Sequence, residues 1–281
     1  MLPVRDEQLI SSSKSVALPS VAWFYLSAEF LIGAALSGIL ALLAIIRTAL
    51  PKPPRELSGD VVLVTGAATP LGRAVALEFA RHGCSMVCVD TDLNRVKETT
   101  SSIVSRCSNV EDISPEHRRQ DVSVAERKVY AYQCNLWDRH DILRLAKKTL
   151  DEVGRIDVLV TCVGHPGEDI LDTVSTTLMS HYWTVLAFLP SMLRNEKAHV
   201  VGITPANSSA DAFRGSRAAV VGLMESLGHE LSDRNSHVTF ITIAPKIEPR
   251  QNDEEVAKSI IDAVRRDQRS IDPSWTRSRV R

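Results

Sequence analysis

Residues 60–83 read DVVLVTGAATPLGRAVALEFARHG, and this stretch decides the fold. It begins with a β-branched apolar run, residues 61–64, that has the length of a buried strand. Gly66 then opens a turn, and apolar residues recur at helical spacing until Gly83, where a helix is expected to end. The next apolar strand, residues 85–89, is followed by Asp90. A strand, a glycine turn, a helix, a strand and a terminal acid together predict a dinucleotide-binding βαβ unit.

The same alternation of strand and helix patterns continues to residue 266. Further strands are predicted at 129–134, 156–162, 200–204 and 238–243, and helices at 93–106, 138–153, 171–194, 210–231 and 254–266. The polar stretch 108–126 predicts an exposed loop. Because the strands are apolar on both faces, we expect a single α/β domain of the Rossmann type, a doubly wound parallel sheet covered by helices on both sides.

Composition excludes several other classes of protein. Lys and Arg number 33 against 34 Asp and Glu, so charge gives no argument for a nucleic-acid partner. The five cysteines are odd in number and form no CxxC pair. We interpret them as reduced, buried thiols of a cytosol-facing domain, and we predict no metal site.

The N-terminal region contains a long apolar segment. Residues 21–46 read VAWFYLSAEFLIGAALSGILALLAII, with Glu29 as the one charged residue. Because about 20 apolar residues cross a bilayer core, this segment predicts a single-pass transmembrane helix. A buried core helix is usually shorter, and a signal peptide has a shorter apolar run preceded by a compact basic region.

The residues that flank the apolar segment set its expected orientation. Arg47, Lys52 and Arg55 follow it and place the globular domain in the cytosol. Small residues four apart, such as Gly33 and Ser37, either pack two such helices together or reflect the ordinary composition of membrane spans. The predicted organisation is a polar N-terminal segment (1–20), a membrane anchor (21–46), a Pro-rich linker (47–56), the α/β domain (57–272) and a basic tail (273–281). The tail either contacts anionic headgroups or is solvated.

Four motifs relate the domain to a known family. The turn from Thr65 to Gly72, the segment LVTCVG (159–164), HYWT (181–184) and AFLP (187–190) resemble the short-chain dehydrogenase/reductase family. With the N-terminal anchor, they are similar to a subgroup of membrane-anchored retinol and hydroxysteroid dehydrogenases of the endoplasmic reticulum and lipid droplets. The resemblance implies a hydride transfer between a nicotinamide and an alcohol or carbonyl carbon, and a tendency to dimerise.

The resemblance also locates the catalytic positions, and all four are substituted. The family's YxxSK helix aligns with residues 213–217, FRGSR, so that Phe213 replaces the proton-donating tyrosine and Arg217 the lysine. The asparagine position falls at Thr177 and the serine position at Ala206 or the preceding proline. Phenylalanine has no proton to give, and the planar arginine fork does not copy the point charge of a lysine. We therefore predict no catalytic residue.

For the cofactor, the resemblance implies contacts from Gly66, Gly72, Asp90, Asn135 and Gly164. An acid at position 90 accepts hydrogen bonds from a ribose 2′-hydroxyl and repels a 2′-phosphate, which favours NAD over NADP. Pro70 removes a backbone N–H from the anion-binding turn. Weak NAD binding and a turn that only maintains the fold both remain open. Arg73 either contacts phosphate or, as we expect, is solvated.

Two hypotheses about function follow. The first is a pseudoenzyme, a membrane-tethered binding or scaffolding protein that forms a homodimer, or a heterodimer with an active relative, through the helices containing Thr177 and Phe213. The alternative is an NAD-dependent oxidoreductase that acts on the CH–OH group of a lipophilic alcohol of the retinol or steroid type, with Ser208 or His165 as proton donor. The short connection after residue 245 argues against an enclosing lid. We expect His181 to have a packing role.

Overall fold

The computed structural model describes residues 20–49, 54–108, 128–205, 208, 210–234, 236–243 and 252–268. The predicted loop at 108–126, the basic tail, the N-terminal segment 1–19 and Ala206 lie almost entirely outside these residues. The chain divides into two compact units, Met1–Pro51 and Lys52–Arg281, which are described separately.

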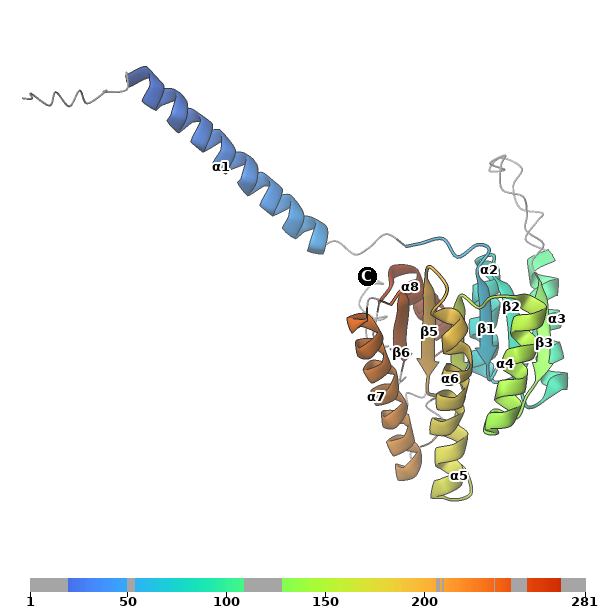
Figure 1. Cartoon of the computed structure of the whole chain (residues 1–281). Helices are drawn as coiled ribbons and strands as arrows, with labels where there is room; N and C mark the ends of the chain where they lie inside the picture. The colour runs from blue at the N-terminus through green and yellow to red at the C-terminus, as the bar shows by residue number, and fades with distance from the viewer. Residues whose placement is uncertain are drawn as a thin grey trace, which may run out of the picture. The chain divides into compact units, whose positions relative to one another are not determined.

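The second unit contains one six-stranded parallel sheet in the order β3-β2-β1-β4-β5-β6 (Figure 1). The strands are β1 (Val61–Thr65), β2 (Ser85–Asp90), β3 (Val129–Gln133), β4 (Val158–Cys162), β5 (Ala198–Ile203) and β6 (Val238–Ile243). The register pairs Leu63 of β1 with Val87 of β2 and Leu159 of β4. Every residue of β4 and β5 is buried, as expected for parallel strands that helices cover on both faces.

Helices cover both faces of this sheet. They are α2 (Pro70–Arg81), α3 (Leu93–Ser108), α4 (Arg139–Val153), α5 (Ile170–Val174), the π-helical turn η2 (Ser175–Met179), α6 (Ser180–Met192), α7 (Asp211–Asp233) and α8 (Asp253–Arg266). One core lies between the sheet and α2, α3 and α8, and the other lies between the sheet and α4, α6 and α7. The predicted doubly wound α/β fold is therefore confirmed.

The predicted elements agree closely with the observed ones, with one correction. The pattern over 171–194 predicts one long helix, but η2 divides it into α5 and α6. The hydroxyls of Thr176 and Ser180 donate to carbonyls within this stretch. π-Helical turns insert an extra residue into a helix and often occur at functional sites.

The first unit contains α1 (Ser20–Ala49), a helix of 30 residues. The apolar side chains that are described in this helix, among them Phe30, Leu31 and Ile32, are exposed. Over the part of the chain that the structure describes, no helix meets the combined criteria of length and apolarity for crossing a membrane. The transmembrane prediction for residues 21–46 is thus not confirmed.

Candidate functional site

The backbone of the glycine turn between β1 and α2 packs closely against other parts of the same turn and against the end of β4. Gly66 has φ of 74°, and a Cβ atom placed there would lie 1.9 Å from the carbonyl oxygen of Cys162. A Cβ atom on Gly72 would lie 2.1 Å from the carbonyl oxygen of Gly66. Both glycines are therefore required by close backbone approaches, which is the reason for glycines in a dinucleotide-binding turn.

Thr69 and Pro70 begin α2. The Thr69 hydroxyl accepts a hydrogen bond from the Gly72 N–H at 3.1 Å and donates to the Gly66 carbonyl at 2.7 Å. Pro70 occupies the first helical position, where the N–H has no partner within the helix and proline is well tolerated. Pro70 is thus compatible with the fold. Because it lacks an N–H at the helix N-terminus, we expect it to weaken anion binding there.

Asp90 lies at the carboxyl end of β2 and is held in place by its neighbours. One carboxylate oxygen accepts from the Ala68 N–H at 2.9 Å, and the other accepts from the N–H and hydroxyl of Thr91 at 2.7 and 3.1 Å. A carboxylate offers about four lone-pair sites. Asp90 therefore retains acceptor capacity for a ribose hydroxyl, while its charge opposes a 2′-phosphate.

These residues fit the adenosine and pyrophosphate parts of NAD in type and placement, with one donor missing. Gly66 and Asp90 lie at the carboxyl ends of adjacent strands, and the N-terminus of α2 points its backbone N–H groups to the same edge. Pro70 removes one of those N–H groups. When bound, NAD would supply the hydride acceptor for an alcohol dehydrogenation.

Gly164, Thr177 and η2 lie together at the carboxyl end of β4. Gly164 has φ of 129°, and a Cβ atom there would lie 3.1 Å from Cγ2 of Thr177. Thr177 is fully buried, and its hydroxyl donates to the His165 carbonyl at 3.3 Å, as the Thr176 hydroxyl does at 2.9 Å. The η2 turn therefore holds the loop that follows Gly164.

The buried ring of His181 contacts the end of β4 and the start of the same loop through both of its nitrogen atoms. Its Nε2 lies 3.0 Å from the Val163 carbonyl, and its Nδ1 lies 2.7 Å from the Thr161 hydroxyl. Burial lowers the pKa of His181 to about 4, so the ring is neutral and its Nε2–H donates to Val163. The predicted packing role is confirmed, because the ring is fully buried.

Phe213 and Arg217 lie on α7. Phe213 is 0% exposed. Arg217 is half-buried, its Nε donates to the Thr204 hydroxyl at 3.4 Å, and burial lowers the pKa of its guanidinium. Ser208 accepts the Ala210 N–H at 3.1 Å just before this helix.

Other groups near the sheet edge are not activated for proton transfer. The hydroxyl of Tyr132 donates to the Glu152 carboxylate, and burial together with that carboxylate raises the pKa of Tyr132. Burial also raises the pKa of the Cys162 thiol to about 12. Cys84, Cys88, Cys134 and Cys162 are buried free thiols, as predicted.

Arg73 and Asn135 each form a hydrogen bond within the domain. Arg73 is half-buried and donates to the Ser102 hydroxyl of α3 at 2.6 Å, so the expectation of a solvated side chain is wrong. Asn135 accepts the Trp137 N–H through its side-chain oxygen at 3.2 Å and thereby shapes the turn into α4. The indole ring of Trp137 lies 5.7 Å from the imidazole of His165, centroid to centroid.

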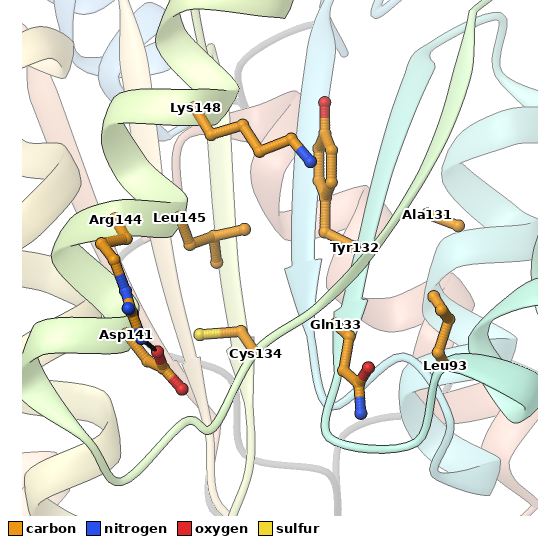
Figure 2. Close-up of a pocket in the computed structure, with 9 residues that line it drawn as sticks. All are labelled: Leu93, Ala131, Tyr132, Gln133, Cys134, Asp141, Arg144, Leu145 and Lys148. Atoms are coloured by element: carbon orange, nitrogen blue, oxygen red, sulfur yellow. Dashed lines mark hydrogen bonds and ion pairs between the residues drawn. The ribbon is translucent and has the colours of Figure 1, made fainter.

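A pocket of about 360 Å³ opens at the β3 edge of the sheet (Figure 2). It is lined by Leu93, Ala131, Tyr132, Gln133, Cys134, Asp141, Arg144, Leu145 and Lys148. The Lys148 ammonium lies 5.0 Å from the Tyr132 ring centroid, and Arg144 pairs with Asp141. The predicted cofactor residues Gly66, Gly72, Asp90, Asn135 and Gly164 do not line this pocket.

Comparisons with known proteins agree with this geometry. A family model described as short chain dehydrogenase matches residues 108–256. Short-chain dehydrogenase/reductase family 16C member 6 of Bos taurus is 31% identical over 251 residues, which cover 78% of this chain and 73% of the relative. The chain belongs to the short-chain dehydrogenase/reductase family.

Retinol dehydrogenases are also among the relatives. Retinol dehydrogenase 10-B of Danio rerio is 32% identical over 195 residues, covering 63% of this chain and 58% of the relative. Epidermal retinol dehydrogenase 2 of Homo sapiens is 30% identical over 199 residues, which cover 66% of this chain and 58% of the relative. The chain thus spans less than two thirds of the length of these two relatives.

Solved structures share the fold. A metagenomic short-chain oxidoreductase in complex with NADP superposes with a TM-score of 0.62 at 22% identity, covering 77% of this chain and 97% of that one. A short-chain dehydrogenase/reductase from Burkholderia phymatum in complex with NAD superposes with a TM-score of 0.62 at 20% identity. The match covers 80% of this chain and 92% of that one.

Sequence reasoning did not find two features of the site. The η2 turn has no signature in the apolar periodicity, and the contact between Trp137 and His165 depends on the strand order. An aromatic side chain in each of the loops that follow β3 and β4 is the sequence signal that points to this contact.

Proposed function

We propose that this chain is a membrane-attached short-chain dehydrogenase/reductase homologue that binds NAD weakly and has lost the family's proton-transfer chemistry. It would act as a binding or scaffolding protein. The observation that carries the proposal is Phe213, which has no ionisable group and is fully buried where the family resemblance places the proton donor.

The neighbouring substitutions support the same proposal. Arg217 at the lysine position contacts the Thr204 hydroxyl, and a guanidinium forms a broad fork instead of a compact charge that would lower the pKa of a tyrosine. Thr177 at the asparagine position is buried against Gly164. A family enzyme needs a group that can exchange a proton with the substrate oxygen near working pH.

NAD binding is the part of the function that the residues support most directly. Gly66 and Gly72 permit the close backbone approaches, and Asp90 offers an acceptor for the ribose. The missing N–H of Pro70 is expected to cost about 1 kcal/mol or more, because charge-assisted hydrogen bonds are the stronger ones. We therefore expect NAD to bind more weakly than to a family member with glycine at this position.

Two measurements on the purified full chain test this proposal. Titration of NADH fluorescence measures binding, and incubation with NAD and a panel of retinols and sterols measures turnover. Binding without turnover supports the proposal. Turnover of any of these alcohols, lost on Ser208→Ala or His165→Ala, overturns it.

The second candidate is an NAD-dependent oxidoreductase of lipophilic alcohols, and the named relatives favour it over the first. Several relatives at about 30% identity are named retinol dehydrogenases. His165 is the better candidate donor, because its imidazole is exposed and histidine is the most common general acid or base in enzymes. The Ser208 hydroxyl already accepts a backbone N–H.

A double variant separates the two candidates. Phe213→Tyr with Arg217→Lys restores the family's residue pair on α7. If the parent chain is inactive and the variant turns over retinol, the substitutions alone account for the loss. If the parent chain is active and the variant is not faster, the second candidate is favoured.

We further propose that α1 attaches the protein to the endoplasmic reticulum or to lipid droplets, with the α/β domain in the cytosol. The helix has 30 residues, or about 45 Å at 1.5 Å per residue, and its described apolar side chains are exposed. Alkaline carbonate extraction and protease accessibility of tagged protein test the attachment and its orientation. Release by carbonate would contradict it.

The proposed dimer uses α5, η2, α6 and α7. Ile170, Leu171, Leu186 and Leu193 are exposed at 69, 76, 40 and 45% on this side of the domain. Chemical cross-linking of the full chain, with and without Leu186→Asp, tests the interface. Cross-linked dimer that persists in the variant would place the interface elsewhere.

A further inference from the structure

A second pocket, of about 510 Å³, lies at the edge of the sheet opposite the glycine turn. Its lining comes from the segment that leads into β1, from the end of α2 and from the last turn of α8. Because β1 and β2 both begin here, the pocket lies at the amino ends of these strands. Gly66 and Asp90 lie at the carboxyl ends of the same two strands, so the pocket is a different site from the predicted cofactor site.

Two arginines give this pocket free hydrogen-bond donors. Its charged lining residues, among those that the structure describes, are Glu56, Arg81, His82 and Arg265. Arg81 is exposed, and one of its nitrogens pairs with Glu78 at 2.7 Å. Arg265 uses its Nε for a backbone carbonyl at 3.1 Å. Since a guanidinium carries five N–H donors, both arginines retain donors for a ligand.

The kind of ligand follows from the positions of these two arginines. Arg81 and Arg265 belong to the last turns of α2 and α8, where helix carbonyls offset part of each positive charge. Glu56 offsets more of it, so the net charge left for a ligand is small. Recognition therefore depends on the directed donors of two planar forks, which match the several acceptor oxygens of a phosphate group.

The pocket is close along the chain to the apolar helix α1. That helix ends at Ala49, and Pro54 is the first residue that lines the pocket, so only residues 50–53 separate the two. Five steps of at most about 3.6 Å each span no more than about 18 Å. Pro54 therefore stays within that distance of the end of α1 for any arrangement of the two units.

The segment directly after Pro54 is fixed to the domain. The Arg55 N–H donates to the Arg265 carbonyl at 2.8 Å, and Arg265 Nε donates back to the Arg55 carbonyl at 3.1 Å. Arg55 also forms an ion pair with Asp60 at 2.7 Å, and the next apolar residue, Leu57, is buried. If α1 is attached to a membrane, this edge of the domain is therefore held near the membrane surface.

We propose that this pocket binds the phosphate of an anionic phospholipid headgroup, with Arg81 and Arg265 as donors. The exposed Ser58 hydroxyl, which also lines the pocket, supplies a further donor. The inference rests on the proposed attachment through α1, which places anionic lipids of the cytosolic leaflet close to the pocket. Tethering raises their effective concentration above that of free phosphate. Such binding directs the glycine turn, at the opposite edge of the sheet, towards the cytosol.

Native mass spectrometry of the full chain from neutral detergent micelles tests the inference. The titrants are dioctanoyl phosphatidylserine, dioctanoyl phosphatidylcholine and inorganic phosphate. We expect phosphatidylserine to bind at least about fivefold tighter than phosphatidylcholine, and phosphate to bind more weakly than either lipid. Arg81→Gln and Arg265→Gln should each weaken phosphatidylserine binding by about fivefold, the usual contribution of one basic residue at a membrane surface.

Arg234→Gln is the matched control for Arg81→Gln. Arg234 pairs with Glu230 of its own helix, as Arg81 does with Glu78, and it lies at the end of α7 just before β6 begins. It does not line the pocket, so this variant should bind phosphatidylserine like the parent. Arg81→Gln leaves the hydrogen bonds between Arg55 and Arg265 intact, so its effect does not depend on the fold of this edge.

Three outcomes would overturn the inference. If Arg81→Gln binds phosphatidylserine like the parent, or if Arg234→Gln weakens it equally, the pocket is not the site. If phosphatidylcholine binds as tightly as phosphatidylserine, anionic headgroups are not selected. If inorganic phosphate binds at least as tightly as the lipid, free phosphate is the ligand. Release of the chain by carbonate would contradict the attachment through α1 separately, because the titration in micelles does not require that α1 be inserted in a bilayer.

Discussion

The buried imidazole of His181 makes the stability of the domain depend on pH in a calculable way. Burial lowers the pKa of His181 from 6.5 to about 4, and that of His199 shifts in the same way. The unfolded chain therefore takes up these protons more readily than the folded chain. Stability is at its full value above pH 6.5 and is lost as the pH falls from 6.5 towards 4.

The magnitude follows from the shift. Each pH unit between the two pKa values changes the free energy of unfolding by about 1.4 kcal/mol per histidine. Between pH 7 and pH 5, His181 thus accounts for a loss of about 2 kcal/mol. His181→Gln keeps a donor for the Val163 carbonyl and removes the titrating group. It is expected to cost about 1 kcal/mol at pH 7 through the lost Thr161 contact.

Urea unfolding of the full chain in neutral detergent at pH 7 and pH 5 measures this effect through tryptophan fluorescence. The difference between the two pH values should be about 2 kcal/mol smaller in His181→Gln than in the parent. His140→Gln is the matched control, because that ring is exposed and solvated. An equal pH dependence in the parent and His181→Gln would refute the reasoning, since it would mean that His181 is not held neutral by burial.

Further substitutions separate fold from binding. Gly72→Ala places a Cβ atom 2.1 Å from the Gly66 carbonyl oxygen, so we expect a loss of about 1–3 kcal/mol in unfolding free energy together with loss of NADH binding in a fluorescence titration. Gly83→Ala, at φ 85°, should cost about 1–2 kcal/mol and leave NADH binding intact. Pro70→Gly should strengthen NADH binding in the same titration, because it restores a backbone donor. Phe213→Tyr alone should lower the thermal midpoint, because it adds a hydroxyl to a fully buried site at a cost of about 1–3 kcal/mol.

The fold could be predicted from local sequence patterns, because apolar strand runs and a helix-ending glycine determine the order of its strands and helices. Strands β1, β2 and β4 are continuous apolar runs, and Gly83 ends the first helix region at φ 85°. Apolar residues on both faces of a strand require covering layers on both sides, which leaves few arrangements other than a doubly wound parallel sheet.

The parts that sequence reasoning missed depend on contacts between distant residues. Arg73 reaches Ser102, which lies 29 positions away, and no local pattern indicates this bond. The contact between Trp137 and His165 requires knowledge that the loops after β3 and β4 converge. The η2 turn was missed because one extra residue in a helix hardly alters its apolar pattern.

Pro70 explains why the same turn can specify the fold while leaving its function open. At the first position of α2, proline costs the helix nothing, because the N–H that it lacks would have no partner in the helix. That same N–H is the kind of group that binds an anion at a helix N-terminus. Selection for folding therefore does not oppose this proline, whereas selection for tight pyrophosphate binding does. A chain that keeps Gly66, Gly72 and Asp90 but carries Pro70 retains all that the fold requires, and it must obtain its affinity for a nucleotide from contacts beyond the phosphates.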